Sequence, residues 1–540
     1  MKGREIAVNP WWTLSVLCLS LVMVVLGNTV LNVALPTLIR ELGASSAQLQ
    51  WMVDSYALVF AGLLLTAGAL GDRFGRKGAL IVGLVIFGGA SLASAFATSP
   101  NHLIATRAVM GLASAFVMPA TLSILVSVFP PERRGRAIAI WAGFAGVGAA
   151  IGPIAGGWLL DHFYWGSVFL LNIPVVVVAL VAGRWLVPRS RDPQRSELDP
   201  MGAGLSIVGF GALLYAIIEG PNLGWTDPLV VSSFAVAAVS LVVFGIWELR
   251  SEHPMLDLTF FKDPRFSAAS GAIAVVFLVM FGTFFLMTQY LQIVRAYSPL
   301  EAGVRMLPFA LTMMVGAPAS ARVVERVGAR RVVSLGLATG GLGLALATTV
   351  GVGTPYGWLV VVLIVQALGM SLTMAPSTTL IMASVPAGKS GVGSAWNDTT
   401  RELGGALGVA ILGSLATSQY VTSLQDATLA LPDGLGAVAE ASVGSALQAA
   451  ERLPAELSRD LTEAARAAFV DGMGLAFGLA AALAFAASAA VARYLPRSVA
   501  AGDTASQTPP PDHVPGITAM GTLQSGTRLW KGAMHERLHR

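Results

Sequence analysis

Five ionisable side chains lie inside long apolar segments of this 540-residue chain: Asp54, Arg107, Asp398, Arg401 and Glu402. An ionisable residue within a membrane-length apolar segment costs about 2.5–3.5 kcal/mol, so such residues mark ion or proton pathways by default. Protonation and the binding of a charged ligand can compete for one carboxylate. These residue types therefore indicate proton-coupled transport of a charged compound.

Three of these residues are grouped by their spacing. Asp398, Arg401 and Glu402 are three and four positions apart, which places them on one face of a helix. One proton or one monovalent cation would neutralise this set of two acids and one arginine. We expect Asp398 to be the principal coupling carboxylate; alternatively, Glu402 carries the proton while Asp398 stays paired with Arg401. A purely structural alternative is a self-neutralising cluster along a wet crevice.

Asp54 and Arg107 lie at similar depths in two other apolar segments. Asp54 falls about one turn inside the outer end of its segment. A guanidinium at this depth would tune the charge state of the carboxylate. We expect Asp54 to attract cations or to carry a proton near the outer mouth, with Arg107 important for coupling. The structural alternative is a permanent ion pair between the two residues.

A glycine-rich element combines close packing with a bend. It consists of Gly148, Gly152, Pro153, Gly156 and Gly157. Small residues four positions apart let helix backbones approach closely, and proline removes one backbone hydrogen bond. We expect a bend on which this helix moves against the opposite half of the protein. Ordinary membrane packing is the alternative.

A polar loop follows the second apolar segment, and its characteristic positions are Gly68, Asp72, Arg73, Gly75, Arg76 and Lys77. The segment from Val323 to Arg331 repeats the same acid-Arg-x-Gly order. We interpret the loop as a cytoplasmic latch in which Asp72 meets a helix N-terminus or an arginine and Gly75 allows a tight turn. An ordinary solvated loop is the alternative.

Several other chemistries are not supported by the sequence. Cys18 is the only cysteine, so the chain has neither an intrachain disulfide nor a thiolate metal cluster. Residues 383–390 fit a loose phosphate-loop pattern, but they join two apolar segments rather than a strand and a helix. The basic residues lie between apolar segments rather than in one patch, which argues against nucleic acid. We therefore expect no enzyme, metal or cofactor, and a proton gradient as the energy source.

Apolar segments of about 20 residues, the length that crosses a ~30 Å hydrocarbon core as helix, must position these groups. The chain is 55% hydrophobic and only 12% charged, which is outside the range of soluble domains. The fourteen predicted spans are 12–35, 49–71, 78–98, 103–129, 136–159, 166–187, 201–220, 228–248, 266–293, 301–321, 329–350, 356–383, 391–415 and 469–493.

Basic residues set the predicted topology. They gather in alternate connections, at Arg73, Arg76 and Lys77; Arg133, Arg134 and Arg136; Arg184, Arg189, Arg191 and Arg195; and Arg322, Arg326, Arg330 and Arg331. Loops rich in lysine and arginine stay in the cytoplasm. We therefore expect a monomeric, multi-pass protein of the bacterial inner membrane with both termini cytoplasmic.

The repeated polar loop predicts two equivalent six-helix halves with a helix pair between them. The expected parts are 1–187, an N-terminal bundle; 188–265, the inserted pair with its cytoplasmic connections; 266–493, a C-terminal bundle with a long external loop at 416–466 that has helical patterning; and 494–540, a disordered cytoplasmic tail.

Taken in order, these motifs resemble the major facilitator superfamily, in its fourteen-span drug:proton antiporter branch, over residues 12–493. The matches are Gly68 to Leu80 with the family's G-x-L-x-D-R-x-G-R-K-x-x-L loop, Arg107 and Gly111 with R-x-x-x-G, Gly148 to Gly157 with the antiporter motif, Thr29 to Pro36 with the span-1 element, and Trp165 to Pro174 with W-x-x-x-F-x-x-N-x-P. The resemblance implies two six-helix bundles and two added helices.

Trp51 to Tyr56 and Glu402 to Gly405 are most similar to the quaternary-ammonium and dye exporters. The resemblance implies a central cavity, alternating access by rocking bundles, and lipophilic monovalent or divalent cations as substrates. Two positions differ from that pattern, because Gly27 replaces a usual aspartate and Met313 stands where some relatives have an acid. These differences argue against divalent substrates and shift the expected coupling onto Asp54 and Asp398.

The sequence thus predicts a proton-driven exporter of lipophilic, cationic drugs, dyes or biocides. Two alternatives stay open. The first is an exporter dedicated to one endogenous lipid or metabolite, and the second is a membrane receptor or scaffold that transports nothing.

Overall fold

A computed structural model describes residues 9–190, 199–252, 254, 257–385, 390–429, 431–432 and 434–496. All regular elements within these ranges are helical. One compact unit extends to Arg497. The predicted tail, 494–540, falls almost wholly outside the described residues, as do Arg191 and Arg195.

The N-terminal half contains α1 (Pro10–Leu42), α2 (Ser46–Phe74), α3 (Arg76–Ala95), α4 (Pro100–Val128), α5 (Pro131–His162), α6 (Ser167–Leu170) and α7 (Asn172–Leu186). Local signals set its first boundaries. Gly43 ends α1 with φ +65°, and Ser45 begins α2 through a capping box with Gln48. Gly75, with φ +124°, makes the sharp turn from α2 to α3 that a residue with a Cβ would disfavour.

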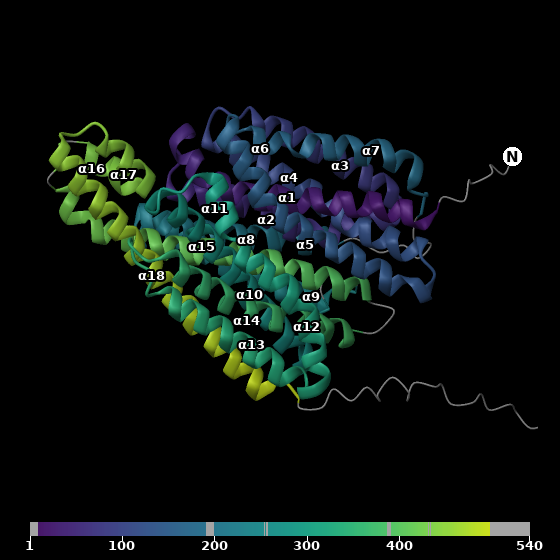
Figure 1. Cartoon of the computed structure of the whole chain (residues 1–540). Helices are drawn as coiled ribbons and strands as arrows, with labels where there is room; N and C mark the ends of the chain where they lie inside the picture. Colours follow the sequence, from purple (N-terminus) through teal and green to yellow (C-terminus); the bar gives the residue numbers. More distant parts are fainter. Residues whose placement is uncertain are drawn as a thin grey trace, which may run out of the picture. The chain divides into compact units, whose positions relative to one another are not determined.

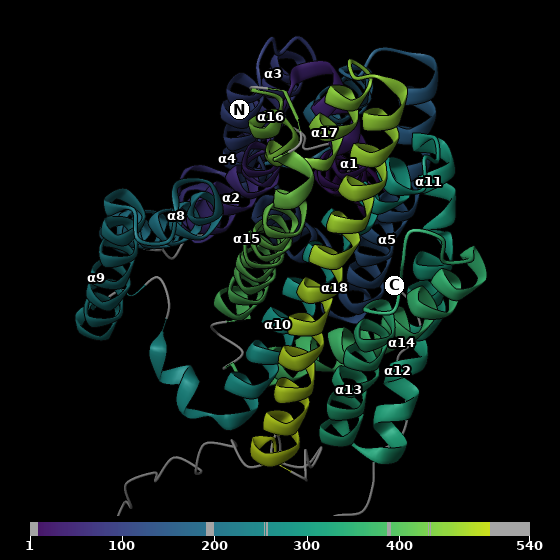
Figure 2. The same ribbon diagram turned by 90° about the vertical axis from the view of Figure 1, so that its left-hand side faces the viewer.

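The inserted pair is formed by α8 (Pro200–Leu223) and α9 (Pro228–Arg250), followed by the short η1 (Leu258–Lys262). Asp199 fixes the start of α8, since it accepts hydrogen bonds from Gly202 N at 2.8 Å and from Trp247 Nε1 on α9 at 2.9 Å. Helix α8 packs on α2 and on α15 (Ser390–Thr428), while α9 packs mainly on α8. Figure 2 shows α8 beside α2 with α9 on its outer side.

The C-terminal half contains α10 (Pro264–Gln289), the π-helical turn η2 (Tyr290–Val294), α11 (Pro299–Arg305), α12 (Leu307–Val327), α13 (Ala329–Ala347), α14 (Tyr356–Ala383), α15, α16 (Leu435–Ala441), α17 (Val443–Ala450) and α18 (Ala455–Tyr494). Two predicted spans are interrupted. The span at 166–187 is divided into α6 and α7, and the span at 301–321 is divided into α11 and α12.

The segment predicted as a long external loop, 416–466, is mostly helix. Helix α15 continues to Thr428, α18 begins at Ala455, and α16 and α17 lie between them. Tyr420 on α15 ties these elements together, because its hydroxyl donates to Ala439 O at 2.8 Å. Val443 and Ala446 on α17 are buried as well. We call α16 and α17, with the adjoining ends of α15 and α18, the outer hairpin (Figure 1).

At the end of the molecule that carries the outer hairpin, polar side chains connect the two halves. Ser46 Oγ of α2 donates to Ala441 O of α16 at 3.1 Å, and Ser414 Oγ of α15 donates to Gln50 Oε1 at 3.1 Å. Gln292 Nε2 of η2 donates to Val33 O of α1 at 2.8 Å. This end, called the hairpin end below, is therefore closed by direct contacts between the halves.

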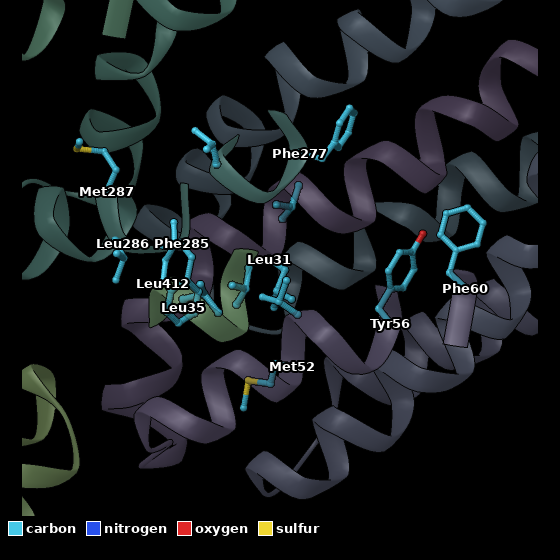
Figure 3. Close-up of a cluster of buried hydrophobic side chains, with 14 of the residues drawn as sticks. Leu31, Leu35, Met52, Tyr56, Phe60, Phe277, Phe285, Leu286, Met287 and Leu412 are labelled. Carbon is cyan, nitrogen blue, oxygen red and sulfur yellow. The ribbon is translucent and has the colours of Figure 1, made fainter. Parts of the chain in front are cut away.

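An apolar layer continues the contact inward from the hairpin end. It combines Leu31 and Leu35 of α1 and Met52, Tyr56 and Phe60 of α2 with Phe277, Phe285 and Leu286 of α10 and Leu412 of α15 (Figure 3). These side chains come from both halves and are all buried. The closed hairpin end thus rests on hydrophobic packing as well as on polar contacts.

Eleven of the described helical segments are long and apolar enough to cross a membrane. Helices α2, α5 and α13 are not among them, although each has at least 19 residues. Both α2 and α5 contain residues whose side chains are outside the described part of the chain, and the count of eleven applies to described residues alone. The structure thus supports a multi-pass membrane protein.

Candidate functional site

Arg107 on α4 is fully buried against α1 and α2. Gly111, one turn further along α4, makes this position possible, because a Cβ there would collide with the carbonyl oxygen of Tyr56. The R-x-x-x-G spacing therefore brings α4 close enough to α2 for the guanidinium to reach the backbone of both neighbouring helices.

The Arg107 guanidinium binds three oxygen acceptors. Nε donates to Met52 O at 3.1 Å, Nη1 to Gly27 O at 3.1 Å, and Nη2 to Asn28 Oδ1 at 2.8 Å. The group also lies over the Tyr56 ring, 4.4 Å from its centroid, and the Tyr56 hydroxyl donates to Ser114 Oγ at 2.7 Å. These bonds hold Arg107 in the N-terminal half through neutral partners.

Asp54 is fully buried on α2, and neither of its carboxyl oxygens has a hydrogen-bond partner within the described residues. The permanent ion pair between Asp54 and Arg107 that the sequence left open is therefore not formed in this structure. Helical spacing places Asp54 on the same face of α2 as Gln50, Trp51 and Leu58.

That face of α2 meets α8 and α15 in a small apolar cluster. It is made of Ala47, Ala57, Leu58, Leu214, Ile218, Ala406 and Ala410, with Trp51 packed against it. Burying an ionised carboxylate without donors costs much more than burying the neutral acid. An uncompensated negative charge at Asp54 is therefore costly while the hairpin end is closed.

The acidic cluster of α15 lies nearer to the opposite end. Asp398 and Arg401 form an ion pair, with Oδ1 and Nη1 3.6 Å apart. Arg401 Nη2 also donates to Thr378 Oγ1 of α14 at 3.1 Å, and the guanidinium lies 5.4 Å from the centre of the Phe277 ring. In the amide orientation that satisfies both its ends, Asn397 accepts from Arg401 Nη2 at 3.2 Å.

Glu402 differs from Asp398 in its partners. Its Oε2 atom is buried and has no hydrogen-bond partner among the described residues. Glu402 interacts electrostatically with Asp398 and Arg401 and, across the interface between the halves, with Arg107. Because Ala406 and Ala410 follow it at four-residue intervals, Glu402 lies on the face of α15 that packs on α2. Asp54 and Glu402 are therefore unsatisfied acids of one interface, contributed by opposite halves.

The polar loop between α2 and α3 fastens the N-terminal half. Lys77 Nζ donates to Arg184 O at 2.8 Å and to Val187 O at 2.7 Å, which caps the C-terminal end of α7. Arg76 Nη1 donates to Ser123 O of α4 at 3.4 Å. Arg73 is exposed and lies over Phe74, Gly68 approaches Pro119, and the side chain of Asp72 is outside the described part of the chain.

The glycine element of α5 packs against both halves. Gly148, Gly152 and Gly156 face α1, where added Cβ atoms would meet Val25, Thr29 and Val30. Gly157 faces the other half, since a Cβ there would lie 2.6 Å from Leu300 Cα of α11. Gly303 of α11 approaches the Pro153 carbonyl in the same way. The element thus supports the closed hairpin end.

Comparison with known proteins decides the family. The sequence profile of the Major Facilitator Superfamily matches residues 17–409. The chain belongs to the Major Facilitator Superfamily. The resemblance predicted from the motifs is thereby confirmed.

The superfamily members most similar in sequence include three curated proteins. The chain is 36% identical to the multidrug efflux pump LfrA of Mycolicibacterium smegmatis, covering 89% of this chain and 96% of that protein. It is 33% identical to the tetracenomycin C resistance and export protein of Streptomyces glaucescens, covering 91% of each. It is 36% identical to the methyl viologen resistance protein SmvA of Salmonella typhimurium, covering 86% of this chain and 93% of that protein.

Solved structures show the same fold. A bacterial homolog of the human lysosomal transporter Spinster, in an inward-facing and unoccupied conformation, superimposes with a TM-score of 0.63 at 19% identity. The match covers 91% of this chain and 98% of the other. A peptide transporter in complex with sulfate gives a TM-score of 0.58 at 16% identity over 89% and 95% of the two chains.

Several residues at the site of this superfamily member were not predicted as such from the sequence. Tyr56, Asn28 and Thr378 bind Arg107 or Arg401, or stack on them. Asn28 had one usable signal, since it stands beside Gly27 where an aspartate is usual. Thr378 had none, because its role depends on the packing of α14 against α15.

Proposed function

We propose that this protein is a proton-coupled antiporter that exports lipophilic, monovalent cationic drugs, dyes or biocides across the bacterial inner membrane. The single observation that carries the proposal is the α2–α15 interface, where Asp54 and Glu402 bring carboxyl oxygens without partners from opposite halves. The export and resistance functions in the names of the three relatives support it. Such a protein is a transporter and not an enzyme.

The proposed arrangement has fourteen spans: α1 to α5, α6 with α7, α8, α9, α10, α11 with α12, α13, α14, α15 and α18. Residues 1–187 and 266–493 form the two six-helix bundles, and 188–265 holds the inserted pair. Both termini are cytoplasmic in this arrangement. An even number of spans places them on the same side of the membrane as the connections rich in arginine and lysine, which stay in the cytoplasm. The hairpin end, which is closed in the described conformation, then faces outward, and the protein works as a monomer.

The proposed cycle exchanges one proton for one cation at the interface acids. In the state open to the cytoplasm, an acid releases its proton there and the cation binds in its place. The halves then rock, the hairpin end opens, and a proton from outside displaces the cation. The net result is one cation out and one proton in. Arg107 and Arg401 supply fixed positive charges near the acids. These charges disfavour the binding of a proton and a cation at the same time.

The two acids of α15 have different roles in this proposal. Asp398 is paired with Arg401, whereas Glu402 has a free oxygen and lies toward Arg107. We therefore assign the proton exchange of the second half to Glu402, with Asp398 orienting Arg401. This choice corresponds to the alternative that the sequence left open.

Flux through the purified protein tests the proposal. Proteoliposomes containing the full chain should move tetraphenylphosphonium against its gradient when a pH gradient is imposed, and a protonophore should stop the movement. Adding the cation to detergent-solubilised protein should release protons into weakly buffered solution. A protein that binds cations but gives no flux would be a receptor or scaffold. Flux of one endogenous lipid or metabolite alone would indicate a dedicated exporter.

A further inference from the structure

A recess at the hairpin end lies apart from the α15 acids, between the outer ends of α2, α4 and α8. Its volume is about 500 Å³, within the range of cavities that hold drug-sized ligands. The side chains that line it include Gln48, Trp51, Asn101, Ile104, Glu219 and Asn222. The inserted helix α8 supplies the single acidic side chain among these residues, Glu219.

The charge of Glu219 is not neutralised by a described cation. Trp51 Nε1 donates to Oε1 at 3.1 Å, and Asn222 Nδ2 donates to Oε2 at 3.4 Å, so both partners are neutral. The ion pairs found among the described residues lie elsewhere in the chain. Gln48 Nε2 donates to Asn101 Oδ1 at 3.2 Å, which satisfies those two amides with one another. Glu219 therefore gives the recess a net negative charge.

The walls of the recess are suited to an apolar cation. Trp51 presents an indole next to the carboxylate, and Ile104 adds an aliphatic surface. A cation over an indole face gains about 0.5–1 kcal/mol at an exposed site and about 2 kcal/mol or more when it is desolvated. Tyr215 extends the aromatic surface behind Trp51, with ring centres 6.3 Å apart. A carboxylate bordered by aromatic and aliphatic groups favours a lipophilic cation over a hydrated metal ion.

Trp51 also connects the recess with the central acids. It precedes Asp54 by three residues, so the two side chains share one face of α2. Trp51 packs against the apolar cluster of Leu214, Ala406 and Ala410 on that face, while its Nε1 atom binds Glu219. The indole therefore contacts both the apolar cluster on the Asp54 face of α2 and the carboxylate of the recess.

We propose that this recess is a second, outer binding site for lipophilic monovalent cations, in which Glu219 supplies the charge and Trp51 the aromatic wall. The role in export rests on the function proposed above: a cation that leaves Asp54 binds there before it reaches the medium. Because the recess is present while the hairpin end is closed, it binds cations without the halves having to separate.

Direct binding to the full-length protein in lipid nanodiscs tests the site, with radiolabelled tetraphenylphosphonium as the probe. The double variant Asp54→Asn/Glu402→Gln removes the central acids, so that the remaining binding reports the recess. We expect this variant to bind one equivalent, and the addition of Glu219→Gln to weaken binding by at least about tenfold, or about 1.4 kcal/mol. Glu219→Asp, which keeps the charge, should retain most of the affinity.

Asp227→Asn is the matched control. Asp227 is an acid on the connection from α8 to α9, where it caps α9 through Leu229 N at 2.8 Å, and asparagine preserves such a cap. Asp227→Asn in the double variant should leave the affinity unchanged. Triphenylphosphine oxide, an uncharged probe of similar shape, should bind all variants equally weakly.

The outcomes separate the site from the proposed function. No binding to the double variant, or equal affinity with and without Glu219→Gln in correctly folded protein, overturns the outer site. If Glu219→Asp and Glu219→Gln lose the same amount of affinity for tetraphenylphosphonium, the charge of Glu219 does not recognise the cation, and that part of the proposal is overturned. If the wild type binds the probe at the recess but gives no flux in proteoliposomes, the outer site stands and the antiporter function fails.

Discussion

Asp398 and Arg401 form an ion pair of 3.6 Å within one turn of α15, directly beside Glu402, whose Oε2 atom has no partner in the described structure. An acid locked to an arginine exchanges its proton less readily than an unsatisfied neighbour. Adjacent acids titrate as a coupled set, so the two residues have to be compared in the same assay.

Glu402→Gln should abolish proton release on addition of a monovalent cation, whereas Asp398→Asn should only weaken it. The reason is that, of these two acids of α15, Glu402 has the oxygen without a partner among the described residues and lies on the face that packs on α2. Proton release from detergent-solubilised protein is measured with a pH indicator. If Asp398→Asn loses proton release and Glu402→Gln keeps it, Asp398 is the coupling acid, as the sequence alone predicts.

Asp54→Asn should lower efflux of monovalent cations at least tenfold while the protein still inserts in the membrane. Asparagine fills the same space in the apolar cluster but cannot exchange a proton or hold a cation by charge. Flux per molecule in proteoliposomes, normalised to the amount of inserted protein, is the measurement. Resistance and flux equal to the wild type would remove Asp54 from the mechanism.

Arg107→Ala should lower both the melting temperature and the flux. It leaves the Asn28 amide oxygen without its Arg107 donor, and a buried polar group left unsatisfied costs about 1–3 kcal/mol. It also removes one hydrogen bond from each of the Met52 and Gly27 carbonyls, which keep their helical partners. Arg107→Lys keeps the charge but not the planar fork that reaches three acceptors. Arg107→Lys should therefore melt at a higher temperature than Arg107→Ala, but its flux should still be lower than that of the wild type. Normal flux per molecule at several pH values in either variant would limit Arg107 to a structural role.

The parts of this molecule that were predictable from sequence are those that depend on local pattern. Apolar segments located the main helices, and three- and four-residue spacing placed Asp398 beside Arg401. Hydropathy did not locate the extension of α15 to Thr428, because it measures preference for lipid and not helicity. The acceptors of Arg107 had no sequence signal at Met52 and Gly27, since a backbone carbonyl is present at every residue.

Non-local packing set the remaining features. Trp51 and Glu219 are 168 positions apart, and only the packing of α8 on α2 brings them together. Likewise, the glycine element was predicted as a site of close approach, but the sequence did not show that Gly148 meets α1 while Gly157 meets α11. A pattern on one helix records that a neighbour comes close, and it carries no information on which neighbour that is.

Gly157→Leu should open the hairpin end. A Cβ added at this position would lie only 2.6 Å from Leu300 Cα. A leucine side chain must therefore push α11 away from α5. Overpacking of this kind costs about 1–3 kcal/mol, enough to shift an equilibrium between two conformations. We expect proton leak or loss of export with normal insertion. Gly143→Ala is the control on the same helix, because none of the described residues lies within 4 Å of a Cβ added at Gly143. If Gly157→Leu exports at the wild-type rate without proton leak, the glycine element serves only for ordinary helix packing.

Lys77→Met should destabilise the N-terminal half by about 1 kcal/mol or more, the scale of a lost hydrogen bond from a charged group. The ammonium caps α7 through the carbonyls of Arg184 and Val187, at 2.8 and 2.7 Å, and methionine fills the same space without donating. Both partners belong to the half that contains Lys77, so the loss should appear as a lower melting temperature together with reduced flux. Lys77→Arg can donate to the same carbonyls and should restore both. Reduced flux at an unchanged melting temperature would contradict this, since it would mean that Lys77 acts between the halves in another conformation.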